Sequence, residues 1–294
     1  MNTRTRTGPA TGATGSIQTH GSCATGMNGT KRLLMGLAFA VAVMVPQRYA
    51  MAASVNLGAA SGFAVLAGSG MTITGPTTVT GDIGTYPTPA ITGMANLVLN
   101  GTDYTSDSTT MLNAKNALGA AYTDAAGRTP TTLYGAVFDL GEQTLHAGVH
   151  NSTGSFGITG TLTLDAQGDA NAVFIFQAGS TLTAEVGSRV VLLNGAQAKN
   201  VFWQVGSSAT LKTDAYFTGS ILALTDISLG THATVDGRVL AQNGAVTFIS
   251  NTINSVPEGG TLQLLGLGIV ALIAFKRGRP SCATPGKGCE SHLG

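Results

Sequence analysis

Cysteine and charge are scarce in this 294-residue chain, and each scarcity excludes a class of structure or function. The three cysteines lie towards the ends, at Cys23, Cys282 and Cys289, so residues 53–255 contain no thiol. That stretch can form neither a disulfide nor a cysteine-ligated metal site. Its stability must come from apolar burial and backbone hydrogen bonding, for which about 200 residues suffice.

Charged residues make up only 10% of the chain, and they are unevenly distributed. Residues 53–255 contain six basic and twelve acidic residues, a net charge of −6, and the other nine basic residues lie towards the two ends. A nucleic-acid-binding protein needs a basic face to neutralise phosphates, so the sequence argues against that function. Thr, Val, Gly, Ala and Leu are abundant instead; Thr and Val favour strands, and Gly favours tight corners.

Residue patterns typical of catalysis are also missing from the middle of the sequence. His146 and His150 are four residues apart, but Gly148 and Val149 between them favour a strand or turn over a metal-binding helix. Most aspartates stand beside glycine, where Asp commonly caps turns. The carboxylate pair of glycoside hydrolases and the Gly-rich Asp repeat of calcium-binding β-helices are not present. We therefore predict a protein that is not an enzyme and needs no metal or cofactor.

The N-terminal segment has the layout of a secretory signal. Lys31 and Arg32 precede the apolar run 33–45, and Ala50-Met51-Ala52 places small residues where a signal peptidase cleaves. Thirteen apolar residues are too few to span the ~30 Å hydrocarbon core of a bilayer, which disfavours the alternative of a membrane anchor. We predict that residues 1–52 are an N-terminal extension and export signal.

The C-terminal segment resembles the PEP-CTERM class of sorting signals. A Val-Pro-Glu-Gly-Gly motif at 256–260 is followed by an apolar run at 261–275 and by basic residues at 276–279. The motif departs from Pro-Glu-Pro, and the chain continues to Gly294. The resemblance implies processing of residues 256–294 by an exosortase, only transient membrane contact, and a secreted or cell-surface location in a Gram-negative bacterium. A plain tail anchor is the alternative.

An internal repeat indicates how residues 53–255 fold. Segments 202–219, 220–237 and 238–253 align; the first two are eighteen residues long and the third is sixteen. Each has an apolar strand, a turn and a second short strand, which is typical of the stacked coils of a β-solenoid. One segment, 105–126, reads instead as a helix with N-cap candidates at 106–108 and an end at Gly127. Its apolar face is formed by Met111, Leu118, Ala121, Tyr122 and Ala125.

The second strand of each repeat predicts an exposed ladder of small polar side chains. Thr210-Leu211-Lys212, Ser228-Leu229-Gly230 and Thr247-Phe248-Ile249 align, Thr181-Leu182-Thr183 fits the same frame, and Thr161-Leu162-Thr163 precedes it. Strand side chains alternate between faces, so if the central Leu or Phe points inward its neighbours point outward. The predicted face comprises Thr72, Thr74, Thr181, Thr183, Thr210, Lys212, Ser228, Gly230, Thr247 and Ile249. Lys212 and Ile249 interrupt it.

Five phrases in this stretch resemble the ice-binding-like proteins. They are Thr-Gly-Asp-Ile-Gly at 80–84, Tyr-Thr-Asp-Ala-Ala-Gly-Arg at 122–128, Ala-Val-Phe-Ile-Phe-Gln at 172–177, Asn-Val-Phe-Trp-Gln-Val-Gly at 200–206, and Gly-Arg-Val-Leu-Ala-Gln-Asn-Gly-Ala-Val-Thr at 237–247. The resemblance implies a right-handed, discontinuous β-solenoid of triangular section over residues 53–255, with one helix alongside. In that fold N-terminal strands can insert between later coils.

The resemblance also implies a function, because several family members bind ice through one flat, Thr-rich face. We expect a monomeric extracellular protein whose ligand is ice and which inhibits ice growth or recrystallisation. The alternative is a cell-surface or matrix adhesion module that binds exopolysaccharide. For Trp203, the alternatives are an exposed carbohydrate platform and a core position, and its apolar neighbours favour the core.

Overall fold

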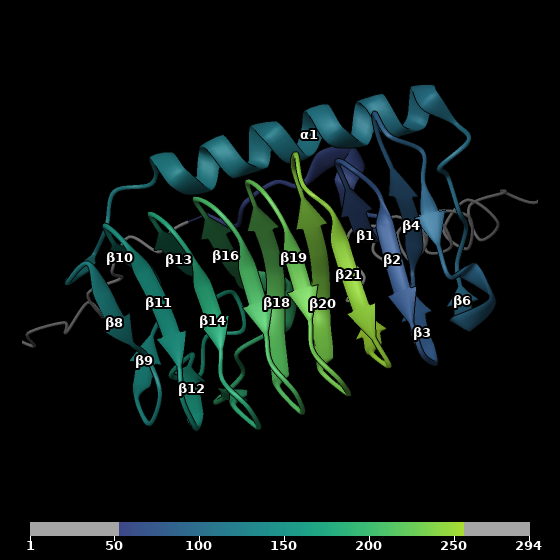
Figure 1. The fold of residues 1–294 in the computed structure, drawn as a ribbon. Coiled ribbons are helices and arrows are strands. Elements are labelled where there is room, and N and C mark those ends of the chain that lie inside the picture. The colour runs from purple at the N-terminus through teal and green to yellow at the C-terminus, as the bar shows by residue number, and fades with distance from the viewer. Residues whose placement is uncertain (1–52, 256–294) are drawn as a thin grey trace, which may run out of the picture. The chain divides into compact units, whose positions relative to one another are not determined.

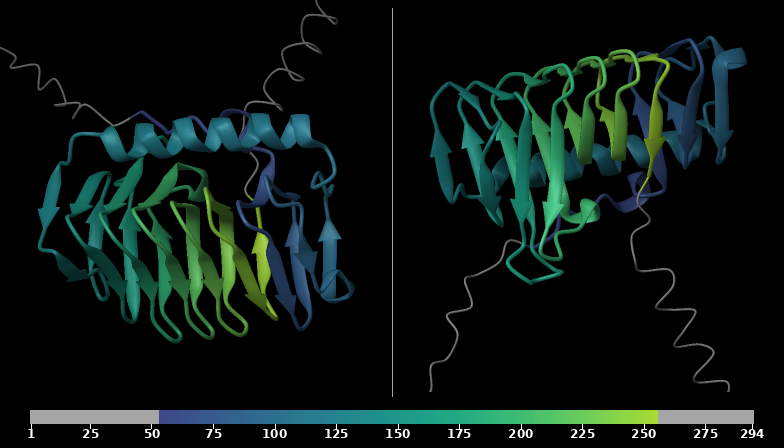
Figure 2. Two further views of the ribbon diagram at one scale, coloured as in Figure 1. Left: turned by 45° about the horizontal axis from the view of Figure 1, so that its top comes forward. Right: turned by 90° about the horizontal axis from the view of Figure 1, so that it is seen from below.

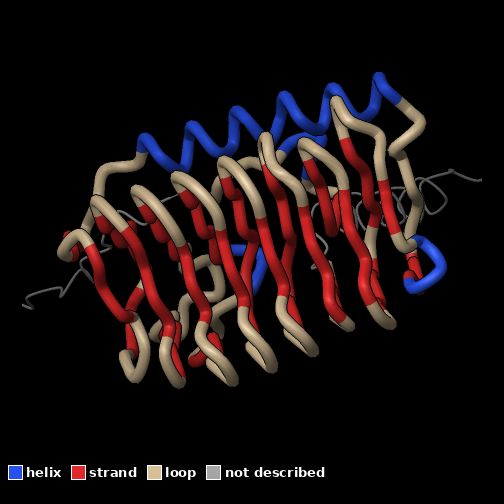
Figure 3. Tube along the Cα trace, in the orientation of Figure 1, coloured by secondary structure: helices blue, strands red, loops and turns tan. Residues whose placement is uncertain are grey.

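The computed structural model describes residues 53–255, which form stacked coils of parallel β-strands with one long helix alongside (Figure 1). Each complete coil has three strands, one on each of three faces, joined by short turns (Figure 3). Every hydrogen bond of the strand ladders therefore joins one coil to the next. The predicted all-β solenoid with one helix is confirmed; the boundaries at 1–52 and 256–294 stay predictions, because those residues lie outside the described part of the chain.

Two strands turn a corner between faces, and their halves belong to different coils. In β18 (Tyr216–Ala223), Tyr216 pairs with Arg189 of one face, whereas Ser220 pairs with Phe202 of another. β20 (Thr234–Ala241) follows β18 in register along its whole length. The corner is at Gly219, whose φ of +111° and close approach to Val201 leave no room for a side chain.

We name the three faces by what covers them. The helix-covered face contains β1 (Phe63–Ala67), β4 (Asp82–Thr85), β7 (Thr132–Tyr134), β10 (Gly148–Ser152), β13 (Phe174–Ala178), β16 (Val201–Val205) and the second halves of β18 and β20. The bare sheet contains β2 (Met71–Thr74), β5 (Ile91–Thr92), β8 (Val137–Asp139), β11 (Ser155–Ile158), β14 (Leu182–Ala184), β17 (Ala209–Leu211), β19 (Ile227–Leu229) and β21 (Val246–Ile249). The third face contains β3 (Thr77–Thr80), β6 (Leu97–Asn100), β9 (Thr144–His146), β12 (Thr161–Asp165), β15 (Arg189–Leu193), β22 (Thr252–Asn254) and the first halves of β18 and β20. Short 3-10 helices lie at η1 (Gly58–Ala60), η2 (Met94–Asn96) and η3 (Ala198–Asn200).

The coils do not stack in chain order. Across the bare sheet the strands run β5, β2, β21, β19, β17, β14, β11, β8. The chain thus builds two coils at one end, crosses to the opposite end through the helix, and coils back until its last coil meets its first (Figure 2). Discontinuous stacking was expected and is observed. The N-terminal strands lie between later coils, as expected: β2 is between β5 and β21, and β3 is between β6 and β22. The first two coils extend the stack beyond the last one.

The helix α1 (Ser108–Gly127) lies along the helix-covered face. Asp107 is its N-cap, with a side-chain oxygen that accepts a hydrogen bond from the backbone N–H of Thr110 at 3.0 Å. Met111, Leu118, Ala121 and Ala125 are buried as predicted, and Tyr122 is half-buried. The N-cap is therefore one of the three predicted residues, although the helix starts three residues after the predicted segment does; it ends as predicted, at Gly127.

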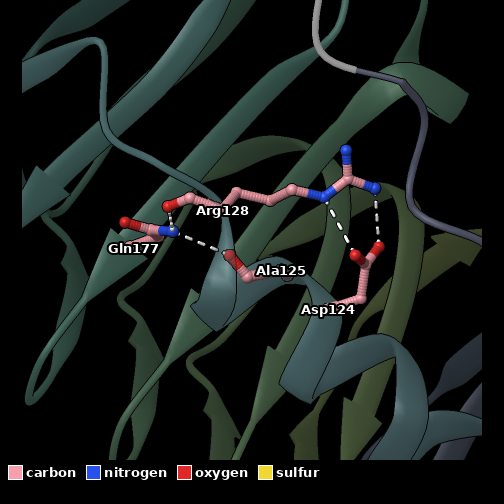
Figure 4. Close-up of polar contacts among 4 residues, drawn as sticks. All are labelled: Asp124, Ala125, Arg128 and Gln177. Carbon is pink, nitrogen blue, oxygen red and sulfur yellow. Dashed lines mark hydrogen bonds and ion pairs between the residues drawn. The ribbon is translucent and has the colours of Figure 1, made fainter.

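Polar contacts fix the C-terminal end of this helix to the solenoid (Figure 4). The side-chain amide of Gln177, on β13, donates hydrogen bonds to the carbonyl oxygens of Ala125 and Arg128, both at 2.8 Å. The Arg128 guanidinium pairs with both carboxylate oxygens of Asp124 at 2.9 and 2.7 Å. Gln177 thus satisfies carbonyl groups that the end of a helix leaves without partners.

Aromatic rings stack from coil to coil inside the solenoid. Trp203 is only 1% exposed and lies face to face with Phe176, with ring centroids 3.9 Å apart. Its indole N–H donates a hydrogen bond to the carbonyl oxygen of Thr218 at 3.0 Å. Trp203 is therefore a core residue, and the alternative of a carbohydrate platform is excluded.

Candidate functional site

The outward side chains of the bare sheet line up in columns, because strand pairing keeps register from coil to coil. The central column runs through Asp139, Gly157, Thr183, Thr210, Ser228, Thr247, Thr72 and Thr92. From Thr183 to Thr92, six successive rungs carry a hydroxyl group, and none carries a charge. The two rungs at the β8 end, Asp139 and Gly157, do not continue the hydroxyl series.

The inward residues of the same strands explain why this column faces outward. Leu182, Leu211 and Phe248 are buried in the core, as are the apolar residues on either side of Ser228 and Thr72. Because side chains alternate along a strand, burying these residues turns the hydroxyl-bearing ones to the surface. In Figure 1 the strands of this sheet lie nearly parallel to one another, so the column stands on a flat face.

A second column lies two residues further along each strand. Thr74 is beside Ile249. Gly230 and Lys212 occupy the next rungs, as the alignment of the repeats predicted. Lys212 is not a free charge, because its ammonium pairs with the Glu185 carboxylate at 2.6 Å. Both side chains are substantially exposed, so this ion pair contributes little to stability. Its effect is to place two charges at the edge of the hydroxyl column.

The position predicted for Thr181 is wrong by two residues. The alignment placed Thr181 beside Thr210, but Thr183 pairs with Thr210, and Leu182 pairs with Ala209. Thr181 lies in a third column instead, where its hydroxyl is 2.8 Å from that of Ser155. The earlier Thr-Leu-Thr segment, 161–163, belongs to β12 on the third face and is not part of the bare sheet.

Sequence reasoning missed two hydroxyl-bearing residues of the bare sheet, Thr92 and Ser155. Thr92 pairs with Thr72 and ends the central column, and Ser155 lies beside Thr181. The repeat could not locate Thr92, because its coil precedes the helix and matches no eighteen-residue segment. Ser155 could have been found from its place in the strand after Gly154.

The titratable groups of the described residues do not form a reactive centre. His150 is buried, and its ring lies 3.0 Å from both the Tyr134 hydroxyl and the carbonyl oxygen of His146. Burial lowers the pKa of His150. Within residues 53–255 no three His, Cys, Asp or Glu side chains gather as metal ligands. An open depression of about 480 Å³ is lined by residues that include Tyr86, Pro89 and Asp103, and neither His146 nor His150 lines it.

The same part of the chain contains no helix long and apolar enough to cross a membrane. The fold and its exposed surface thus define a solenoid with a helix on one face and a flat hydroxyl grid on another. Comparison with known proteins gives the family. The ice-binding-like family matches residues 65–254, so the chain belongs to this family.

Two relatives are similar over most of their length. An ice-binding protein of Nostoc sp. (strain HG1) is 45% identical over 79% of this chain and 90% of its own length. An ice-binding protein of Colwellia sp. is 40% identical over 77% of this chain and 92% of its own length. Among solved structures, an ice-binding protein from an Antarctic biological consortium superposes with a TM-score of 0.67 at 40% identity, covering 72% of this chain and 95% of its own. The structure of an ice-binding protein from Antarctomyces psychrotrophicus superposes with a TM-score of 0.67 at 37% identity, covering 70% of this chain and 100% of its own.

Proposed function

We propose that this protein adsorbs to ice through the exposed side of the bare sheet and so inhibits ice growth or recrystallisation. The observation that carries the proposal is the central column, in which six successive rungs from Thr183 to Thr92 present hydroxyl groups in register. The close similarity to proteins named as ice-binding supports it. The remaining predicted positions, Thr74, Thr181, Lys212, Gly230 and Ile249, flank this column and complete the proposed contact surface.

The geometry explains why such a surface suits ice. Strands are spaced about 4.7–4.9 Å apart, and alternate residues along a strand about 6.6–6.8 Å apart. A flat sheet therefore offers a two-dimensional grid on the scale of a crystal lattice. Each Thr presents a methyl group and a hydroxyl group. The methyl can hold water in a cage-like arrangement while the hydroxyl anchors it by hydrogen bonds.

The adhesion alternative lacks a comparable observation. Exopolysaccharide binding would be favoured by an exposed aromatic platform, and the single Trp203 is buried. The named relatives support ice as the ligand instead. We therefore keep ice adsorption as the one proposed function.

The proposed site is tested by Thr210→Tyr. A ring that projects from the middle of a flat grid lifts neighbouring rungs off the lattice, so thermal hysteresis and recrystallisation inhibition should fall strongly. Thr163→Tyr is the matched control, because Thr163 is also a half-buried strand threonine but lies on the third face. Both variants should keep the wild-type melting temperature. An inactive wild type would refute the function, and equal activity in all three proteins would place the site elsewhere.

Removing the charges at the edge of the column should have the opposite effect. Lys212→Thr extends the grid but leaves the Glu185 carboxylate without its partner at 2.6 Å. The double change Lys212→Thr/Glu185→Thr removes both charges, so it should raise thermal hysteresis above that of the single variant. An unchanged or lower activity in the double variant would mean that the contact surface ends before these residues.

The terminal segments support an extracellular setting. We propose that residues 1–52 direct export through signal peptidase and that an exosortase of a Gram-negative cell removes residues after about 256, which gives a secreted or surface-held monomer. Mass spectrometry of the native protein tests this, because an intact C-terminus at Gly294 would contradict the processing.

A further inference from the structure

The bare sheet is assembled from the two ends of the domain. β21 comes from the last coil and β2 from the first, and they pair in register, with Thr247 beside Thr72 and Ile249 beside Thr74. We call this junction the seam. The central column crosses the seam between its fourth and fifth hydroxyl rungs. Neighbouring rungs elsewhere in the C-terminal coils are joined by about one turn of chain, whereas these two are 175 residues apart in the sequence.

One residue joins three coils at the seam, two through its side chain and the third through its backbone. Asn251 lies in the turn between β21 and β22 and is 2% exposed. Its side-chain amide nitrogen donates to the carbonyl oxygens of Gly230 at 2.7 Å and Ala233 at 3.1 Å, both in the coil before it. Its side-chain oxygen accepts from the N–H of Ile249 at 2.5 Å. All the polar atoms of the amide side chain therefore have partners, which fixes its orientation.

The backbone of Asn251 completes the connection to the first coil. Its N–H donates to the hydroxyl of Thr77 at 3.4 Å, and that hydroxyl donates to the carbonyl oxygen of Gly75 at 3.2 Å. Thr77 is buried, and it immediately precedes the third-face pair of Thr78 with Thr252. At the residue before Asn251, the backbone N–H of Ser250 donates to the carbonyl oxygen of Thr74 at 3.0 Å. These contacts lie at the corner where the bare sheet ends.

We infer that Asn251 is a positioning residue for the proposed ice surface: it holds the two halves of the central column in register across the seam. The inference rests on the proposed function, since Asn251 is buried and does not itself contact ice. The hydroxyl grid can match an ice lattice only when its rungs are evenly spaced and lie in one plane. A small displacement at the seam would leave Thr72 and Thr92 out of step with Thr247 and the rungs beyond it, although each half stayed folded.

The test compares two buried asparagines at different corners. Asn251→Ala removes the side-chain hydrogen bonds that fix the turn against the preceding coil, and it keeps the backbone N–H that contacts Thr77 across the seam. Asn200→Ala is the matched control, because Asn200 is also buried and its amide donates to a carbonyl oxygen, that of Ala170, at 3.3 Å. Asn200 precedes β16 of the helix-covered face, away from the bare sheet. Thermal hysteresis, the set of ice planes coated by fluorescently labelled protein, and melting temperature are measured on wild type and both variants.

We expect Asn251→Ala to lose most of the thermal hysteresis and to coat fewer ice planes, whereas Asn200→Ala loses melting temperature only. If Asn251→Ala yields no folded protein, Thr77→Val takes its place, because it removes the hydroxyl at the seam and keeps the side-chain shape. Equal hysteresis in the seam variant and Asn200→Ala at matched melting temperature overturns the inference while the proposed function stands. An inactive wild type refutes both.

Discussion

At the scale of the residue, the effect of a substitution on stability depends on whether the side chain points into the core or towards solvent. Leu211 is 0% exposed and points into the core, whereas Ser228, on the next coil, is exposed. Leu211→Asp should lower the free energy of unfolding by more than about 3 kcal/mol, because it buries a carboxylate without a partner. Ser228→Ala should stay within about 0.5 kcal/mol of wild type. Urea unfolding measures both; equal stabilities would contradict the strand register.

Lys115 gives the stability a dependence on pH. It is 5% exposed, and its ammonium donates to the carbonyl oxygens of Ala241 at 2.6 Å and Gln242 at 2.5 Å. Burial lowers the pKa of Lys115 from 10.5 to about 8. Between these two pKa values the unfolded chain holds a proton that the folded protein has released. The contribution of Lys115 to the free energy of unfolding is therefore constant below pH 8 and rises from there towards pH 10.5.

Comparison with Lys115→Met isolates this effect, because other titrating groups cancel in the difference. Relative to the variant, wild type should gain up to about 3 kcal/mol of unfolding free energy across this range. Urea unfolding of both proteins at several pH values from 7.5 upwards, in steps of about one unit, measures the difference. A difference that does not change with pH would show that Lys115 stays protonated throughout.

At the scale of the element, the helix is held by its apolar side. Leu118 is buried against the solenoid, whereas Leu112 on the same helix is exposed. Leu118→Ala should lower the free energy of unfolding by about 2–5 kcal/mol, because it leaves a cavity. Leu112→Ala, the matched control, should cost less than about 0.5 kcal/mol. Similar costs for both would mean that the helix packs through a different side.

The elements also show where sequence reasoning succeeds. Between 202 and 253 the coils repeat almost without insertions, so the columns through Thr210, Ser228 and Thr247 could be predicted by alignment. The preceding coil is longer, because a loop and η3 lie between β15 and β16. As a result, Phe174 pairs with Val201, which is 27 residues further along the chain. That extra length follows β15, so it does not shift Thr181. Thr181 was assigned to the wrong rung because Leu182 was aligned with Leu211, whereas Leu182 pairs with Ala209.

At the scale of the whole molecule, sequence predicts the kind of fold better than its assembly. The strand pattern and the helix follow from local residue types, but the pairing of β2 with β21 is a contact between the two ends of the domain. Nothing in the repeat specifies it, since the coil containing Thr72 differs in length and turn residues from the later coils. The rung at Thr92 depends on that pairing and could not be predicted either.

The whole domain should fold without a metal ion. Residues 53–255 contain no cysteine, and the described side chains offer no cluster of three or more ligands. We expect EDTA to leave both the β-sheet circular dichroism signal and the melting temperature unchanged, and size-exclusion chromatography to give a monomer. Loss of the signal on chelation, with recovery on adding a divalent cation, would contradict this.

The helix sets how many coils the molecule can have. It connects the two ends of the stack, which are seven strand spacings apart, or about 34 Å at about 4.8 Å each. Its twenty residues span about 30 Å at about 1.5 Å per residue, and the flanking loops supply the rest. One more coil would demand about three more helical residues. In a solenoid whose coils follow chain order, duplicating a single repeat adds one rung to the surface. Here the same duplication must be accompanied by a lengthening of the helix.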